Sequence, residues 1–454
     1  MQEMVAVILA AGKGIRMKSA LPKVLHGVGG MPMLQHVVNA ARAAGASRTL
    51  VVVGFEGELV RERLGPEVEY VTQSEQLGTG HALMQTQEAL RSFSGTVLLL
   101  CGDTPLLTSA TLQSLTAAHR TSAAAATVLT AAPDDPAGYG RILRDANGRV
   151  LGIVEQKDAS PQELKIGEIN TGIYCFETGP LFAALGGLTC NNAQKEYYLT
   201  DVLAIFARSG QSVEAVQVED FQETLGINSR VQLAEAEAIL RRRKLIELME
   251  GGVTVMDPAS TFVDAGVFIG RDTVLYPFTW IEGATSIGEG CHIGPNTRIS
   301  DSVLGNEVTL HFSYAHACRL ADAVTVGPYV HLRPGTQLAS GVKVGNFVEI
   351  KNSQVGQGSK VPHLSYIGDT DMGSGVNIGS GTITVNFDGK KKHRTVIGND
   401  AFVGCNTNLV APVTVGDGAY IGAGSTITRD VPPGALGVAR ARQTNIAGWV
   451  ESKN

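Results

Sequence analysis

A glycine-rich loop with basic residues follows the first apolar run of the chain. Val5–Ala10 leads directly into Ala11–Met17, with the sequence AGKGIRM, and Pro22-Lys23 follows. Glycines after a strand let backbone N–H groups approach phosphate oxygens, and the basic side chains neutralise phosphate charge. The loop matches neither GxxxxGKS/T nor GxGxxG. Taken alone, it favours an ordinary strand-to-loop turn over a phosphate site.

A carboxylate follows another apolar run. Thr96–Leu100 is followed by Cys101-Gly102-Asp103. Carboxylate oxygens are hard ligands that suit Mg²⁺. An aspartate after a strand is about as often a helix cap. Both interpretations of Asp103 stay open at this point.

Two cations in the second half of the chain, Arg333 and Lys351, stand 18 residues apart. If the chain coils there with that period, the two side chains stack on one side and form a phosphate clamp. For a lone cation, a solvated surface charge is the better interpretation. The spacing and the nearby His363 favour the clamp.

His363 is a candidate general base, because imidazole exchanges a proton near neutral pH. For any single histidine the default interpretation is a hydrogen-bonded surface residue. His331 and His393 are assigned to that class.

Short apolar runs alternate with helical patterns from Met1 to about Arg230. Val5–Ala10, Thr49–Val53 and Thr96–Leu100 are predicted as buried strands. Leu34–Ala44 and Ala110–Arg120 are predicted as helices between them. Continuous apolar strands alternating with helices predict a mostly parallel, Rossmann-like α/β sheet covered on both faces.

The segment 231–251 contains no proline and is rich in alanine, leucine, glutamate and arginine. It is predicted as one long helix that ends at Gly251-Gly252 and links two domains. Its run Arg241-Arg242-Arg243 is interpreted as a solvated helix face rather than a phosphate contact.

A six-residue period begins after Val253. Aliphatic residues recur at Ile281, Ile287, Ile293 and Ile299; at Val326, Leu332, Leu338, Val344 and Ile350; at Val355, Val361 and Ile367; and at Ile397, Val403, Leu409, Val415, Ile421 and Ile427. A triangular coil of three short strands needs one inward aliphatic residue per side and a tight corner between sides. The 54 glycines of the chain fit such corners. The pattern predicts a solenoid of stacked coils.

The period breaks at Thr384–Val396, where TVNFDGKKKHRTV carries too much charge to fill a core. This segment is predicted to leave the coil as a loop. Loops that project from a rigid scaffold are common binding elements.

Composition excludes several classes of protein. The chain has 454 residues and a formal net charge of -6, whereas nucleic-acid binders usually carry a basic excess. Six scattered cysteines without a CxxC pair disfavour a disulfide framework or a zinc site and favour a reducing cytoplasm. The N-terminal run has no basic region before it and is too short for a signal peptide or membrane span. We expect a soluble cytoplasmic protein without membrane insertion.

The N-terminal motifs resemble the signature of the sugar-phosphate nucleotidyltransferases, which begins here with LAAGKGIRM and Pro22-Lys23. Further matching pieces are Gln73, Gln76–Ala82 (QLGTGHA), Cys101-Gly102-Asp103, Gly138–Arg141 (GYGR), Val154–Lys157 (VEQK), Asn170-Thr171-Gly172 and Asn228. This resemblance implies that a sugar 1-phosphate attacks the α-phosphorus of a nucleoside triphosphate and that pyrophosphate leaves.

The same resemblance implies the roles of the N-terminal residues. Asp103 and Asn228 would bind Mg²⁺, while Arg16 and Lys23 would hold the triphosphate and stabilise developing charge. The implied substrate-binding residues are Leu9, Ala10, Ala11, Gly12, Gln73, Gln76, Gly78, Thr79, Gly140, Glu155, Asn170 and Asn228. Among them, Glu155 and Asn170 would recognise the sugar hydroxyls and an N-acetyl group.

The hexads resemble the left-handed parallel β-helix of bacterial acyltransferases. That handedness departs from the usual right-handed crossover, so it is implied by the resemblance alone. The resemblance also implies a homotrimer with active sites between adjacent subunits.

Together, the two halves resemble the bacterial family of bifunctional N-acetylglucosamine-1-phosphate uridyltransferases and glucosamine-1-phosphate acetyltransferases over essentially the whole chain. The implied substrates are UTP, N-acetylglucosamine 1-phosphate, glucosamine 1-phosphate and acetyl-CoA, and the implied product is UDP-N-acetylglucosamine. His363 would be the acetyltransferase base, and Arg333, Lys351, Tyr366 and Asn377 would hold glucosamine 1-phosphate. The implied acetyl-CoA residues are Ser380, Asn386, Phe387, Cys405, Ala423 and Arg440.

Three acetyl-CoA positions depart from the commonest pattern of that family. Phe387 stands where tyrosine is usual, Cys405 where serine is usual and Ser380 where alanine is usual. These changes put individual contacts with acetyl-CoA in doubt but not the activity. Direct transfer to an amine needs no cysteine nucleophile, so Cys405 is not assigned that role.

The predicted organisation is a uridyltransferase domain at 1–230, a linker helix at 231–251 and a β-helix acetyltransferase domain at 252–454. Two alternatives stay open. One is a nucleotidyltransferase whose β-helix serves only oligomerisation or regulation, and the other is a non-enzymatic scaffold.

Overall fold

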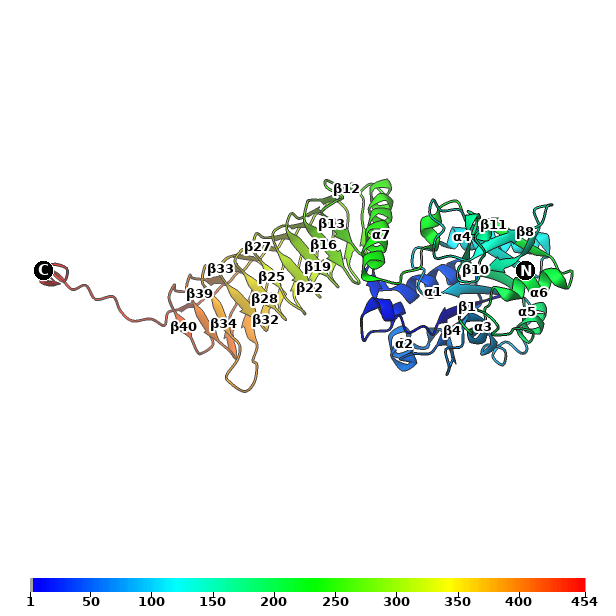
Figure 1. Ribbon diagram of the computed structural model, residues 1–454. Coiled ribbons are helices and arrows are strands. Elements are labelled where there is room, and N and C mark those ends of the chain that lie inside the picture. The colour runs from blue at the N-terminus through cyan, green and yellow to red at the C-terminus, as the bar shows by residue number, and fades with distance from the viewer. Residues whose placement is uncertain (1–2, 454) are drawn as a thin grey trace. The chain divides into compact units, whose positions relative to one another are not determined.

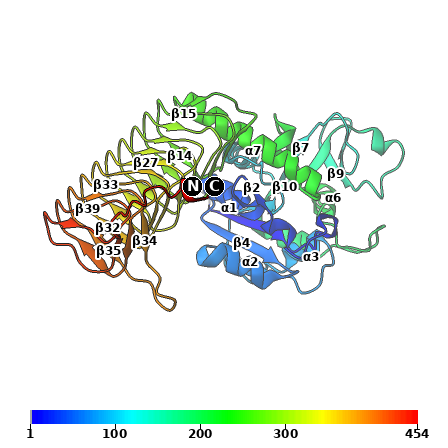
Figure 2. The ribbon, with the colours of Figure 1, turned by 90° about the vertical axis from the view of Figure 1, so that its left-hand side faces the viewer.

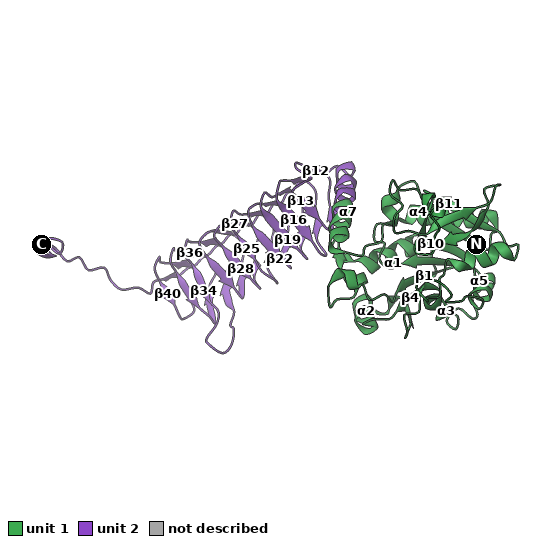
Figure 3. Ribbon diagram, viewed as in Figure 1, with its two compact units in different colours: residues 1–240 green, residues 241–454 purple. Residues whose placement is uncertain are grey.

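The computed structural model describes residues 3–453 and forms two compact units, one up to Leu240 and one from Arg241 onward (Figure 3). Unit 1 is built on one central sheet and unit 2 on stacked three-sided coils. No helix within residues 3–453 combines the length and apolar character needed to cross a membrane.

The central sheet of unit 1 has the strand order β11-β7-β10-β6-β1-β4-β5, with the hairpin β8–β9 beside β10 (Figure 1). The strands are β1 (Met4–Ala10), β4 (Arg48–Val53), β5 (Glu69–Thr72), β6 (Thr96–Cys101), β7 (Ala126–Ala131), β8 (Arg141–Arg144), β9 (Val150–Val154), β10 (Ile169–Glu177) and β11 (Val213–Gln217). β1 runs parallel to β4 and β6, and β10 is antiparallel to β6 and β7. The predicted mostly parallel sheet is confirmed, as are the three predicted strands.

Helices cover both faces of this sheet. They are α1 (Met33–Ala43), α2 (Gly57–Leu64), α3 (Thr79–Met84), α4 (Ser109–Ser122), α5 (Thr178–Leu185) and α6 (Asp201–Arg208). Alternate side chains of β1 pack in two separate hydrophobic cores. Ile8 packs in the core that contains α1 and α4, whereas Val7 packs in the core that contains α5 and α6. A strand buried on both faces is apolar throughout, which explains the continuous apolar runs.

A small hairpin lies between β1 and α1. It consists of β2 (Gly27–Val28) and β3 (Met31–Pro32), and the single-turn helices η1 (Ile15–Met17) and η2 (Lys23–Leu25) precede it. The last helix of the unit, α7 (Arg230–Glu250), continues past Leu240, so the boundary between the two units falls inside it. Gly252, in a left-handed conformation with φ of 91°, follows its end.

Unit 2 is a left-handed parallel β-helix whose strands form three sides (Figure 2). Side 1 contains β12 (Thr254–Val255), β15 (Val274–Leu275), β18 (His292–Ile293), β21 (Thr309–Leu310), β24 (Thr325–Val326), β27 (Lys343–Asn346), β30 (Lys360–His363), β33 (Asn377–Ile378), β36 (Phe402–Val403), β39 (Tyr420–Ile421) and β41 (Leu436–Gly437). Side 2 contains β13 (Thr261–Val263), β16 (Thr279–Glu282), β19 (Thr297–Ser300), β22 (Tyr314–His316), β25 (His331–Leu332), β28 (Glu349–Lys351), β31 (Tyr366–Gly368), β34 (Ile383–Val385), β37 (Asn408–Val410) and β40 (Thr426–Ile427). Side 3 contains β14 (Phe268–Ile269), β17 (Ser286–Ile287), β20 (Val303–Leu304), β23 (Arg319–Leu320), β26 (Gln337–Leu338), β29 (Gln354–Val355), β32 (Thr370–Met372), β35 (Thr395–Ile397) and β38 (Val413–Val415).

The aliphatic residues of the predicted hexads fill the inside of these coils. Each is buried, from Ile281 at 0% exposure to Ile427 at 4%, and they form one continuous core. Full burial of such a side chain stabilises a fold by about 1.5–3 kcal/mol. A single coil cannot bury its own ends, so each coil depends on the coils beside it.

The loop that interrupts the hexads is shorter than the predicted Thr384–Val396, because both ends of that segment belong to strands. The projecting part is 386–394. Thr384 and Thr395 are fully buried. The Thr384 hydroxyl oxygen accepts a hydrogen bond from the Gly368 N–H at 2.7 Å, which lets a polar side chain occupy the interior.

Candidate active sites

A cavity of about 300 Å³ lies at the carboxyl ends of β1 and β6 in unit 1. Ligands of open α/β sheets bind at this end of the strands. The cavity is lined by Leu9, Ala10, Ala11, Gly12, Lys23, Val24, Gln73, Gln76, Gly78, Thr79, Ala82, Cys101, Asp103 and Glu196. It therefore collects eight of the predicted uridyltransferase substrate-binding residues together with Asp103 and Lys23.

Gly78 begins the segment that forms one wall of this cavity, directly before α3. Its φ is 107°, and a Cβ at this position would lie 2.7 Å from the Tyr197 carbonyl oxygen. Backbone hydrogen bonds join Tyr197 to residues before and after Gly78. The Tyr197 N–H donates to the Leu77 carbonyl at 2.8 Å, and the Gly80 N–H donates to the Tyr197 carbonyl at 2.9 Å. Only glycine fits this conformation and this close approach.

Lys23 joins the two predicted metal ligands. Its Nζ contacts the Asp103 carboxylate and lies 2.9 Å from the Asn228 amide oxygen. A carboxylate and an amide oxygen thus converge on one positive charge, which is the donor set that Mg²⁺ prefers. Within residues 3–453 no three His, Cys, Asp or Glu side chains gather as a metal site. Mg²⁺ commonly uses one or two protein ligands and completes its shell with water and phosphate oxygens, so these residues fit it.

The alternative role of Asp103 as a helix cap is wrong. The helix after β6 is α4, and its N-cap is Thr108, whose hydroxyl accepts the Thr111 N–H at 3.2 Å. The adjacent thiol of Cys101 is buried, which raises its pKa to about 12 and keeps it protonated at the cavity wall.

The predicted sugar-binding residues form a second cluster, in which Gly140 directly precedes β8, Glu155 directly follows β9 and Asn170 lies on β10. Asn170 N–H donates to the Gly140 carbonyl at 2.9 Å, and the Glu155 carboxylate accepts the Thr200 hydroxyl at 3.1 Å. The Asn170 amide oxygen accepts from the Tyr174 hydroxyl at 2.9 Å, which leaves its NH₂ group for a ligand. Burial raises the pKa of Glu155.

Some residues lie outside the predicted pattern. Arg16 is on η1 and is exposed, apart from both clusters. Glu196 lines the cavity but follows no strand, so no sequence signal marked it. Tyr139, inside the GYGR motif, has its pKa raised by burial and by the Asp103 charge.

In unit 2, the 18-residue spacing places Arg333 and Lys351 in adjacent coils of side 2. Arg333 N–H donates to the Ile350 carbonyl at 2.8 Å, so the two cations stack as predicted. Arg333 also pairs with Glu349 at 2.7 Å, which sequence reasoning missed. Lys392, on the projecting loop, lies close enough to Lys351 that this charge lowers the pKa of Lys392. Two coils and the loop therefore concentrate positive charge at one place.

His363 ends β30 on side 1 and is exposed. Its Nδ1 lies 2.7 Å from the Asn346 amide oxygen in the preceding coil. With that oxygen as acceptor, Nδ1 carries the proton and the lone pair of Nε2 is available as a base. Of the histidines assigned structural roles, His331 stacks on Tyr314 with ring centroids 5.2 Å apart, and His393 pairs with Asp388 at 2.8 Å.

The loop 386–394 is held by hydrogen bonds at its first residue and within the loop. Asn386 is buried, and its amide donates to Asp369 at 2.5 Å and to the Tyr366 hydroxyl at 3.4 Å. Asp388 accepts the backbone N–H groups of Lys390 and Lys391, each at 2.7 Å. These bonds and His393 lower the pKa of Asp388 to about 2. The loop therefore presents Phe387, 55% exposed, on an ordered frame.

The remaining predicted acetyl-CoA residues form a column just beyond the side-1 strands. Ser380 O accepts the Asn406 N–H at 2.7 Å, and Cys405 O accepts the Gly424 N–H at 2.8 Å. Arg440 Nη1 donates to the Ala423 carbonyl at 2.9 Å. The column runs over successive coils, and Asn377 lies on β33 at its start.

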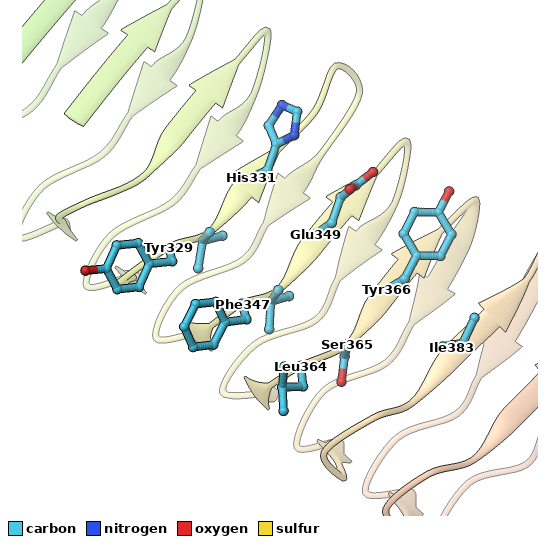
Figure 4. A pocket seen from close by; sticks show the side chains of 10 residues that line it. Tyr329, His331, Phe347, Glu349, Leu364, Ser365, Tyr366 and Ile383 are labelled. Atoms are coloured by element: carbon cyan, nitrogen blue, oxygen red, sulfur yellow. The ribbon is translucent and has the colours of Figure 1, made fainter. Parts of the chain in front are cut away.

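From β15 to β40, each turn from side 1 to side 2 has a left-handed residue at an equivalent position, and we call this series the corner column. It consists of Phe278, Asn296, Phe312, Tyr329, Phe347, Leu364, Gly381, Asn406 and Gly424. The middle members are large and apolar, whereas those from Gly381 onward are small. A cavity of about 510 Å³ lies along the bulky part (Figure 4). Tyr329 and Phe347 stack there with centroids 5.3 Å apart.

Comparison with known proteins relates both units to described families. Residues 6–161 match the model of the MobA-like NTP transferase domain, and residues 394–429 match the bacterial transferase hexapeptide model of six repeats. The bifunctional protein GlmU of Heliobacterium modesticaldum is 58% identical over 442 residues, which cover 97% of this chain and 96% of that protein. GlmU of a Geobacillus species is 55% identical, covering 98% and 97%, and GlmU of Caldanaerobacter subterraneus is 53% identical, covering 100% and 99%.

Proposed function

Because this chain belongs to the family of the bifunctional protein GlmU, we propose that its two candidate sites carry the two reactions of that family. The chain is a bifunctional enzyme of UDP-N-acetylglucosamine synthesis, with a uridyltransferase domain and a hexapeptide-repeat acetyltransferase domain. Glucosamine 1-phosphate is acetylated first and then uridylylated. The alternatives of a purely structural β-helix and of a non-enzymatic scaffold are rejected. We assign uridylyl transfer to residues 1–230, acetyl transfer to 252–454, and a linker role to 231–251.

In uridylyl transfer, a phosphate oxygen of N-acetylglucosamine 1-phosphate attacks the α-phosphorus of UTP, and the bond to pyrophosphate breaks. The protein has little covalent work to do, so positioning and charge neutralisation carry the reaction. Lys23 and Arg16 hold the triphosphate, and Glu155 and Asn170 orient the sugar. The convergence of Asp103, Asn228 and Lys23 supports this assignment. Mg²⁺ held by Asp103 and Asn228 would add further charge neutralisation when bound.

In acetyl transfer, His363 removes a proton from the ammonium group of glucosamine 1-phosphate. The amine nitrogen attacks the thioester carbon, the C–S bond breaks, and CoA leaves as the thiol. Arg333 and Lys351 hold the phosphate, and Tyr366 and Asn377 hold the sugar. The free Nε2 of His363, fixed through Asn346, is the observation that supports this role.

We assign the acetyl-CoA site to the column of Ser380, Cys405, Ala423 and Arg440, which adjoins the small-residue part of the corner column, and to the loop 386–394. Ser380, Cys405 and Ala423 leave room where larger residues stand in earlier coils, and Arg440 supplies a cation. Asn386 and Phe387 close the site from the loop. The departures at Ser380, Phe387 and Cys405 are all at exposed or small residues.

We propose that the active enzyme is a homotrimer. Tyr329, Phe347 and Leu364 are each more than half exposed and stand in one line along the corner column. An exposed line of large apolar side chains is typical of a surface that a partner covers. We also place the enzyme in the cytoplasm, since its six cysteines are free thiols.

One assay tests both site assignments. The full chain receives glucosamine 1-phosphate, acetyl-CoA, UTP and Mg²⁺, and free CoA and pyrophosphate are measured. His363→Ala is expected to lower CoA release by about 100-fold or more, whereas N-acetylglucosamine 1-phosphate is still converted to UDP-sugar. Asp103→Ala is expected to abolish pyrophosphate release and leave CoA release unchanged.

His292→Ala is the matched control, because His292 is an exposed histidine on the same side of the β-helix. It is expected to keep both activities. CoA release at the unchanged rate in His363→Ala would contradict the base assignment. Retained uridylyl transfer in Asp103→Ala would contradict the metal assignment.

A further inference from the structure

The first half of α7 packs against the segment that carries the cationic residues of the uridyltransferase site. Leu233, Ile239 and Leu240 pack on a core cluster that contains Val28 and Met33. Leu106, three residues after Asp103, belongs to the same cluster. One face of this helix therefore contacts both the Lys23 segment and the Asp103 segment.

Two charged residues on this face of α7 make polar contacts beside the apolar ones. Arg230 and Glu237 are seven residues apart, which places them on one side of a helix. The Glu237 carboxylate accepts the backbone N–H of Gly29 at 2.7 Å, in the turn of the β2–β3 hairpin. Gly29 is in a left-handed conformation with φ of 55°, so its N–H direction is set by the tight turn.

Arg230 reaches the two single-turn helices before that hairpin. Its Nε donates to the Met17 carbonyl at 3.3 Å, and its Nη1 lies 3.3 Å from His26 Nδ1. Met17 ends η1, which carries Arg16, and His26 directly follows η2, which carries Lys23. A guanidinium only donates, so His26 Nδ1 must be the acceptor and the ring must be neutral. Burial and the Arg230 charge both lower the pKa of His26, in agreement with a neutral ring.

The same helix holds the second predicted metal ligand. Ser229 caps its first turn by accepting the Gln232 N–H at 3.2 Å, and the Gln232 side chain accepts the Asn228 N–H at 2.8 Å. Asn228 is thus tied to the start of α7, while Arg230 and Glu237 tie α7 to the segment 17–29. The distance between Asn228 and Lys23 depends on both sets of bonds.

We propose that Arg230 and Glu237 are positioning residues for uridylyl transfer, which hold the turns carrying Arg16 and Lys23 in register with Asn228. This inference rests on the proposed uridyltransferase site. Neither side chain touches the reacting atoms. They act by fixing where the two cations stand when charge develops on the phosphates, and misplacement by about 1 Å can lower a rate by about 100-fold.

The test compares Arg230→Ala and Glu237→Ala with the unchanged full-length chain. Each is expected to lower kcat of uridylyl transfer by about tenfold or more, with KM for UTP and for the sugar phosphate changed by less than about threefold. Acetyl transfer by the same preparation is the internal standard and is expected to stay unchanged. Arg230 is exposed, so its loss leaves no buried cavity.

A conservative variant and a matched control distinguish a positioning role of these residues from a merely stabilising one. Glu237→Gln keeps an oxygen acceptor for Gly29 and is expected to retain kcat within about threefold. Glu235→Ala removes the same charge from an exposed position of α7 and is expected to change nothing. The inference is overturned if both alanine variants keep kcat within twofold, or if Glu235→Ala is equally impaired. Absence of uridylyl transfer in the unchanged chain would instead contradict the proposed function.

Discussion

Glu155 holds a carboxylate in a largely buried position of unit 1, where burial raises its pKa. The folded chain therefore binds this proton more tightly than the unfolded chain does. By linkage, the free energy of unfolding contributed by this group falls as pH rises above the ordinary glutamate pKa. A destabilising charge that is kept in a candidate site is typical of a functional residue.

Glu155→Gln distinguishes the effect of the Glu155 charge on stability from its role in sugar binding. The amide keeps an acceptor for the Thr200 hydroxyl but carries no charge, so the thermal midpoint of unit 1 at pH 8 is expected to equal or exceed that of the unchanged chain. A hydrogen bond between this carboxylate and a sugar hydroxyl contributes about 1.5–3 kcal/mol. KM for N-acetylglucosamine 1-phosphate is therefore expected to rise by about 10-fold or more. A lower midpoint together with an unchanged KM would reject the role.

At the residue level, the sequence predicted site residues more accurately where a motif follows a strand than where a residue lies in a loop or pairs across coils. Gly12, Gln73 and Asp103 follow strands, and they meet in one cavity because the carboxyl ends of parallel strands share one edge. Glu196 and Glu349 were missed, since neither follows such a pattern. Their places depend on loop conformation and on side-chain pairing across coils, which local sequence does not encode.

At the level of elements, the loop 386–394 depends on Asp388. This carboxylate accepts two backbone N–H groups and pairs with His393, and its pKa of about 2 keeps it ionised. A depressed acid pKa contributes stability above the ordinary aspartate pKa, and this is lost only as pH falls towards 2. The loop is therefore insensitive to Asp388 protonation across the neutral range.

Asp388→Ala is expected to loosen this loop. Without the acceptor, KM for acetyl-CoA should rise by about tenfold, because the loop must then be ordered on binding. Trypsin should cleave faster after the lysines at 390–392, and uridylyl transfer should not change. Asp388→Asn keeps one acceptor oxygen. Its KM for acetyl-CoA and its rate of trypsin cleavage should therefore lie between those of Asp388→Ala and those of the unchanged chain. An unchanged trypsin rate in Asp388→Ala would contradict the role of this side chain.

The β-helix was the most predictable element, because each inward position repeats the same demand for an aliphatic side chain. Prediction was less accurate where the interior is polar. Thr384 and Thr395 were placed in the loop because the segment 384–396 is highly charged, yet both are buried. A hydrogen bond from the Gly368 N–H lets Thr384 occupy the core. The first half of α7 was predicted as part of a linker, yet its contacts with Gly29 and Met33 lie within unit 1. Such contacts join residues over 200 positions apart, and one helical pattern cannot reveal them.

At the scale of the whole molecule, the two activities differ in the number of chains that we expect each site to need. The residues assigned to uridylyl transfer all lie within unit 1, so one chain can complete that site. The acetyl-CoA site that we propose lies next to the small-residue part of the corner column, where Gly381 and Gly424 replace the large apolar residues of earlier coils. We propose that a second copy of the chain, seated on the bulky part, completes this site.

Tyr329→Glu and Phe347→Glu test this proposal. Association of the chains would bury this carboxylate in the corner column with no cation to pair with it, which costs several kcal/mol per ion. Light scattering is expected to show loss of the trimer, acetyl transfer should fall by about tenfold or more, and uridylyl transfer per chain should be retained. Phe268→Glu is the matched control, because Phe268 is an exposed aromatic residue on side 3. If Tyr329→Glu stays trimeric, or if acetyl transfer persists in a monomer, the corner column is not the interface that completes the acetyltransferase site.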